Sequence, residues 1–207
     1  MDTDRMVWYA CYGSNLLKSR FMCYIKGGLI PGNRRQERGC KDTRDPQKSA
    51  PLIIKHELFF GYHAEKWDGS GVAFINPEKT NTSVTFGRMY LVSEERFWDI
   101  VRQENGLPDN AAIQVNRDEL MKNRSTVVFH DNYYGRILLL GAYEGIPVYT
   151  FTCVEVSAVE RSKAVGNCYQ VIGDGLKEVY GFSDRQISEY IQHSKPALPY
   201  DSTLAAL

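Results

Sequence analysis

The order of strand-like and helix-like runs constrains the fold of this chain most strongly. Short β-prone runs occur at residues 7–11, 57–62, 71–75, 84–92, 136–140 and 147–154. Helical patterns occur at residues 16–26, 94–103, 118–122 and 167–180, and Ser93 is placed to cap the second of them. A last helix opens with the capping-box pattern at Ser183–Gln186. Strands come first and in the middle, and helices are interleaved and then gather near the C-terminus. This order predicts a mixed α+β fold.

The length of 207 residues suits one domain that buries a core without disulfide or metal support. We expect a single domain over residues 1–195 and a flexible tail over 196–207, where prolines and small residues gather. Residues 31–51 are rich in charge and poor in apolar side chains, which predicts a long surface loop. Apart from the short helical run at 118–122, the segment 107–132 has no clear pattern. Glu144–Gly145 is expected to join two strands as a hairpin turn.

Charge and cysteine usage argue against several classes of function. Lys and Arg together number 25, as do Asp and Glu, so the net charge is zero and no nucleic acid partner is expected. No apolar run approaches membrane-spanning length, and the polar start is not a signal peptide, so no membrane partner is expected. The five cysteines are scattered without a metal-ligand spacing, which favours reduced thiols in the cytoplasm. No metal is expected, and the oligomeric state is not predicted.

The turn Tyr12–Asn15 follows the first strand and precedes a helix, with Asn15 at the expected N-cap position. A glycine-containing turn at a helix N-terminus points backbone N–H groups at one spot, which suits a carboxylate or a developing oxyanion. Gly13 would let a ligand approach the backbone closely. Many strand-to-helix turns have this composition, so the turn alone favours a purely structural role.

Glu104 ends the apolar face of its own helix, because Phe97, Ile100, Val101 and Glu104 are spaced i, i+3, i+4 and i+7. Burying a carboxylate is costly unless it is paired or its proton affinity rises. A carboxylate in a dry pocket can act first as a base and then as an acid. The alternative is that the last helical turn frays and Glu104 reaches water. The spacing leaves both interpretations open.

Other candidate nucleophiles have weaker support. A pair of Cys11 or Cys23 with His56 or His63 has no supporting spacing. Ser14 is not part of a G-x-S-x-G elbow.

Taken in order, these pieces resemble the γ-glutamyl cyclotransferase-like family. Its signature after the first strand resembles the run Tyr12, Gly13, Ser14, Asn15 and Leu16. Its Q-E-G segment, which holds the catalytic glutamate, resembles Gln103-Glu104-Asn105-Gly106, although Asn105 stands where the family usually has glycine. The turn Trp67–Gly71 and the run Asn167-Cys168-Tyr169 resemble further parts of the family. The ordered matches cover most of residues 7–192.

The resemblance implies a small mixed β-barrel flanked by helices, and an enzyme that needs no cofactor. The family reaction releases 5-oxoproline and a free amine from a γ-glutamyl amine or γ-glutamyl amino acid by intramolecular aminolysis. By this resemblance Glu104 is the general acid and base. The substrate would be bound by Tyr12, Gly13, Ser14, Asn15, Leu16 and Tyr169. Compared with that family, the loop 31–51 and the segment 107–132 are enlarged, which leaves the amine leaving group open. An amide hydrolase or acyl-transfer enzyme on the same scaffold, or a non-catalytic ligand-binding domain, stays an alternative.

Overall fold

A mixed sheet forms the centre of the computed structural model, which describes residues 5–29, 36–64, 69–193 and 206–207. In these ranges six strands pair in the order β4-β7-β1-β10-β9-β8. Their bounds are β4 Ser49–Ile54, β7 Thr85–Ser93, β1 Met6–Cys11, β10 Ile146–Thr152, β9 Arg136–Tyr143 and β8 Ser125–Val127. The central strand β1 runs antiparallel to β7 and parallel to β10. Five of its six residues are buried, as expected for a strand covered on both faces.

Two smaller sheets lie beside the central one: the hairpin of β5 (His56–Ala64) and β6 (Ser70–Lys79), and the short pair β2 (Gly28–Leu29) and β3 (Gln36–Glu37). The α+β prediction is confirmed, but the described residues do not form the closed barrel that the family resemblance implied. Between β6 and β10 the described contact runs through a side chain. There the Thr152 hydroxyl accepts from the Ile75 N–H at 3.2 Å and donates to the Ile75 carbonyl at 2.6 Å. A side chain thus replaces the main-chain ladder that would make the sheets continuous.

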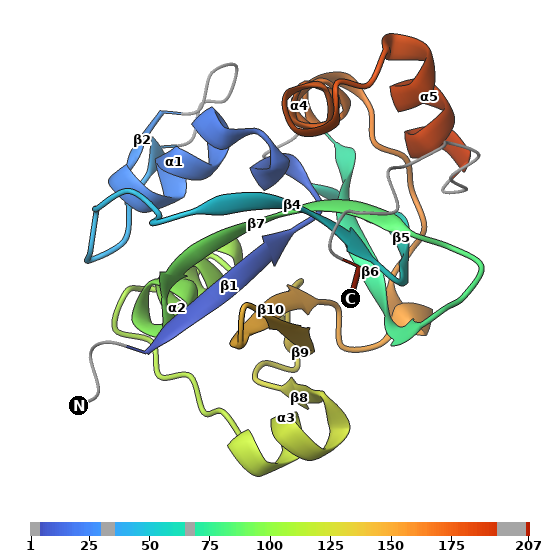
Figure 1. The fold of residues 1–207 in the computed structure, drawn as a ribbon. Helices are drawn as coiled ribbons and strands as arrows, with labels where there is room; N and C mark the ends of the chain where they lie inside the picture. The colour runs from blue at the N-terminus through green and yellow to red at the C-terminus, as the bar shows by residue number, and fades with distance from the viewer. Residues whose placement is uncertain (1–4, 30–35, 65–68, 194–205) are drawn as a thin grey trace.

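The described ranges hold five α-helices: α1 Lys18–Lys26, α2 Glu94–Glu104, α3 Arg117–Asn123, α4 Gly166–Tyr180 and α5 Asp184–His193. Figure 1 shows α1, α4 and α5 above β4 and β7, whereas α3 lies at the opposite end beside β8. None of these helices has the length and apolar character needed to cross a membrane.

Local signals placed several element ends correctly. Ser93 caps α2 by accepting from the Arg96 N–H at 3.3 Å. The capping box of α5 is reciprocal, because the Ser183 hydroxyl accepts from the Gln186 N–H and the Gln186 side chain accepts from the Ser183 N–H. Glu144 and Gly145 join β9 to β10 with φ of 51° and 75°, as a tight hairpin turn requires.

The charged segment 31–51 matches its prediction as a surface loop over residues 38–48, which have no regular structure and are mostly exposed. Its first five residues lie outside the described ranges, and strand β4 begins at Ser49. In the stretch before β4, the buried Gly39 N–H donates to the Gln103 side-chain oxygen at 3.1 Å. The segment is therefore anchored on α2, through partners that its own composition does not reveal.

Most of the tail 196–207 lies outside the described ranges as well, but its last two residues do not behave as a flexible tail. The Leu207 N–H donates to the Ile53 carbonyl at 3.0 Å, and the Lys55 N–H donates to the Leu207 carbonyl at 2.9 Å. An edge strand presents unpaired backbone groups, and residues 206–207 satisfy some of those on β4.

Candidate functional site

The turn after β1 is tighter than the sequence predicts. Ser14–Leu16 form a single 3-10 turn, and α1 begins only at Lys18. The expected helix start at Leu16 is therefore wrong, and so is the assignment of Asn15 as N-cap, since Leu17 holds that position without a side-chain cap. The physical reason is that the Asn15 side chain has other partners.

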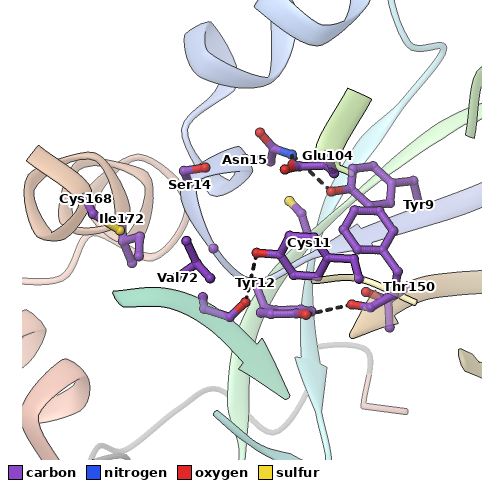
Figure 2. A pocket seen from close by; sticks show the side chains of 14 residues that line it. Tyr9, Cys11, Tyr12, Ser14, Asn15, Val72, Glu104, Thr150, Cys168 and Ile172 are labelled. Atoms are coloured by element: carbon purple, nitrogen blue, oxygen red, sulfur yellow. Dashed lines mark hydrogen bonds between the residues drawn. The ribbon is translucent and has the colours of Figure 1, made fainter. Parts of the chain in front are cut away.

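Those partners join the two candidate motifs. Asn15 is only 3% exposed. Its side-chain amide donates to Glu104 Oε1 at 2.9 Å and to the Tyr9 hydroxyl at 3.1 Å. Asn15 and Glu104 are 89 positions apart in the chain. Figure 2 shows their side chains next to each other, with the Tyr9 hydroxyl beside them.

A cavity of about 40 Å³ opens beside this pair. Its polar end carries Asn15, Glu104 and Tyr9, and in Figure 2 the side chains of Val72, Cys168 and Ile172 lie toward the other side. The full lining comprises Tyr9, Cys11, Tyr12, Gly13, Ser14, Asn15, Val72, Ala73, Glu104, Tyr134, Thr150, Phe151, Cys168 and Ile172. The turn and the glutamate thus share one concave site, a common arrangement for small-molecule binding.

Tyr169 does not line this cavity, contrary to its prediction. It lines a separate, larger cavity beside β5, together with Phe60 and Lys163. The neighbouring Cys168 lines the candidate site with Ile172, because residues four apart share a helix face whereas adjacent residues point about 100° apart.

Leu16 is also outside the lining; its side chain is fully buried in the core. Tyr134 is a lining residue that the sequence did not suggest, and its hydroxyl donates to the Ala73 carbonyl at 3.1 Å. Tyr134 follows a stretch without a usable pattern, so only its contacts identify it.

Glu104 is half-buried, and its negative charge acts on the phenols around it. Burial first, and the charge of Glu104 second, raise the pKa of both Tyr24 and Tyr134 well above the ordinary value. These phenols therefore stay protonated and can donate hydrogen bonds. The Glu104 carboxylate accepts a hydrogen bond from the Asn15 amide at 2.9 Å, so it is a half-buried group with a polar partner.

The thiol of Cys11 lines the same cavity but is not poised as a nucleophile. Burial raises its pKa to about 12, so it is protonated at neutral pH. Within the described ranges, no group of three or more His, Cys, Asp or Glu side chains is placed to hold a metal ion.

Strand β7 and helix α4 hold the turn from outside. The Tyr90 hydroxyl donates to the Asn15 carbonyl at 3.2 Å, and Arg88 donates to the Leu16 carbonyl at 3.2 Å. Helix α4 packs directly on the turn at Gly175. A Cβ atom there would lie 2.5 Å from Leu16 Cβ and 2.6 Å from the Leu17 backbone nitrogen. The site therefore depends on close contact between α4 and the turn.

Replacing Gly175 with alanine is expected to push α4 away from the turn. Overpacking typically costs about 1–3 kcal/mol, which exceeds the gain of about 1 kcal/mol from removing a helical glycine. We expect a lower free energy of unfolding in denaturant titrations. Gly173→Ala in the same helix is the control, because its Cβ would meet only the Ile187 side chain, at 3.2 Å. Equal stability of the two variants would contradict the packing argument.

Comparison with known proteins gives a limited set of likenesses. No family model matches the chain. Over 164 residues the chain is 35% identical to histone deacetylase 5 of Arabidopsis thaliana, a match that covers 76% of this chain and 25% of the relative. The chain thus spans about a quarter of the length of the curated relative it matches.

Two solved structures resemble the fold at 15% sequence identity. An uncharacterized protein from Homo sapiens matches with a TM-score of 0.50 over 98% of this chain and 95% of its own. The chain shares the fold of that protein. A γ-glutamyl cyclotransferase matches with a TM-score of 0.48 over 98% of this chain and 94% of its own.

Proposed function

We propose that this chain is a γ-glutamyl cyclotransferase-like enzyme that releases 5-oxoproline and a free amine from a γ-glutamyl compound. The observation that carries the proposal is the hydrogen bond of 2.9 Å between the Asn15 amide and Glu104 Oε1. It places the glycine-containing turn and a carboxylate at one cavity, which is what intramolecular aminolysis requires: a base beside a group of polar donors.

Glu104 is proposed to take a proton from the substrate α-ammonium group. The freed amine then attacks the γ-carbonyl carbon, and a C–N bond closes the five-membered ring. The tetrahedral intermediate collapses by breaking the bond to the leaving nitrogen. The ammonium nitrogen loses two protons in all, and both end on the departing amine, one of them through Glu104.

The turn is proposed to hold the polar atoms of the substrate and the developing oxyanion. The first N–H groups of a helical turn have no acceptor within that turn, so those of Ser14 and Asn15 are suited to this role. The helix-dipole contribution expected from the sequence is smaller here, because α1 begins at Lys18 rather than directly after the turn. Folding the substrate into a ring-closing shape contributes much of the rate, since the attack is within one molecule.

The first experiment incubates the purified chain with a panel of γ-glutamyl amino acids and amines and measures 5-oxoproline by mass spectrometry. The name of the Arabidopsis relative points to histones, so the panel includes a γ-glutamyl group on the ε-amine of lysine. We expect 5-oxoproline from at least one member. Free glutamate instead would show a hydrolase, and binding without any product would show a ligand-binding domain.

A further inference from the structure

A second, larger cavity lies beside β5. Its volume is about 720 Å³, against about 40 Å³ for the candidate site. Cavities that hold small organic ligands typically measure about 300–1,000 Å³. The lining comes from β5, the first turn of α4, the end of α5 and the segment that leads from β10 past β5 to α4 (Figure 1). The two cavities share no lining residue, so the chemistry of the candidate site does not account for this one.

Close packing and main-chain hydrogen bonds hold the segment 160–163 on the hairpin of β5 and β6. A Cβ atom on Gly71 of β6 would lie only 2.1 Å from Ser162 Oγ. The Ser162 N–H donates to the Phe60 carbonyl at 3.0 Å, and the Gly71 N–H donates to the Lys163 carbonyl at 3.0 Å. The backbone of this wall of the cavity is therefore fixed without a ligand.

The same segment brings two cationic side chains to the cavity. Within the described ranges, neither Arg161 nor Lys163 forms an ion pair. The Arg161 guanidinium lies over the Phe59 ring, 3.9 Å from its centroid, and this contact uses none of its N–H donors. Glu57 is the one acidic residue among those that line the cavity, so two positive charges face one negative charge. The lining therefore suits an anionic group.

The other part of the lining is apolar and aromatic. It includes the buried side chains of Phe60 and Ile191, and Val165, which is 51% exposed. Tyr169 is half-buried, and its hydroxyl forms no hydrogen bond with the part of the chain that the structure describes. A buried tyrosine hydroxyl usually finds a partner. A simple inorganic anion would leave these side chains without contacts, whereas an organic anion would use both parts of the lining.

We propose that this cavity is a second binding site, for a small organic anion with an apolar or aromatic body. Arg161 and Lys163 bind the anionic group, and the body packs against Phe60 and Ile191. The Tyr169 hydroxyl supplies a further hydrogen bond to a polar atom of the ligand. The proposal does not rest on the cyclotransferase reaction, because the cavity shares no lining residue with the candidate site.

The test compares two compounds with the same ring system: naphthalene-2-acetate, which is an anion, and naphthalene-2-acetamide, which is neutral. Each is titrated into the ¹⁵N-labelled full chain, and the backbone amide resonances are followed by nuclear magnetic resonance. We expect the anion to bind about tenfold more tightly than the amide, because hydrogen bonds between charged groups are the stronger ones. The resonances of residues 161–166 and of Tyr169 should shift. Equal affinity of the two compounds, shifts confined to the candidate site, or no binding of either compound would overturn the proposal.

Substitution of the two cations tests the assigned roles. Arg161→Gln and Lys163→Gln are each expected to weaken binding of the anion about threefold to tenfold and to leave binding of the amide unchanged. Lys163 is exposed and its side chain has no partner among the described residues, so Lys163→Gln should keep the fold even if the loss of the Arg161 contact with Phe59 does not.

Lys122→Gln is the matched control. Lys122 is an exposed lysine on α3, which lies at the opposite end of the molecule from α4 and α5 (Figure 1). This variant should bind the anion with wild-type affinity. If Lys163→Gln and Arg161→Gln both bind the anion as tightly as Lys122→Gln does, the two cations do not bind the anionic group and the proposal fails.

Discussion

Replacing Glu104 with glutamine is expected to abolish 5-oxoproline formation while the fold is retained. Glutamine has the same shape as glutamate, and its side-chain oxygen can still accept from the Asn15 amide. It cannot take up a proton at neutral pH, so acid–base catalysis is lost. Such catalysis contributes about 10²–10⁴-fold, and we expect a loss of at least this size in kcat/KM. Mass spectrometry of the product measures it.

Glu95→Gln is the control for this substitution. Glu95 lies on the same helix, is exposed and is not among the residues lining the cavity. The Glu95→Gln substitution makes the same chemical change away from the site, so the activity of this variant should match that of the wild type. Full activity of Glu104→Gln, with circular dichroism showing an intact fold, would exclude Glu104 as the base.

Replacing Arg20 with methionine is expected to lower the free energy of unfolding by about 3–5 kcal/mol, the typical effect of breaking a buried ion pair. The Glu37 carboxylate, whose Oε1 lies 3.3 Å from Arg20 Nη2, would be left in a site where it is 4% exposed. An uncompensated charge in such a site costs more than the pair itself contributes. Chemical denaturation of the purified variant measures the loss.

Two further variants separate this effect from ordinary loss of packing. Arg20→Met combined with Glu37→Met removes both charges, so it should recover much of the lost stability. Arg185→Met breaks an exposed ion pair, in which the Arg185 side chain is 88% exposed and the Glu189 side chain 42% exposed. This variant should change the free energy of unfolding little. If Arg20→Met lowers the free energy of unfolding as little as Arg185→Met does, the buried ion pair does not stabilise the fold more than an exposed one.

Patterns among residues close together in the sequence predicted several helix ends and one hairpin turn. Ser93 and Ser183 cap their helices as the sequence indicates, and Glu144–Gly145 makes the hairpin turn. Glu104 ends α2 where the apolar spacing placed it. These features depend on residues within a few positions of one another, so a single sequence contains most of the information.

Features that depend on distant contacts were predicted less well. Strand β4 was not recognised in the charged segment, because it is defined by pairing with β7. Tyr169 lines a different cavity, whereas Cys168 and Tyr134 line the candidate site, since the rotation of α4 is set by what it packs against. In the described ranges the sheets do not close into a barrel, and Thr152 on β10 contacts β6 through its side chain.

The sequence by itself determined the α+β class, the turn after the first strand and a glutamate at the end of an apolar helix face. For the turn, the sequence alone favoured a purely structural role. For Glu104, it left open a frayed helix end with the side chain in water. Only the tertiary structure decided that they meet, through the hydrogen bond between Asn15 and Glu104. The reason is physical: hydrogen bonds and charge pairs act over a few ångströms in space, whatever the separation along the chain.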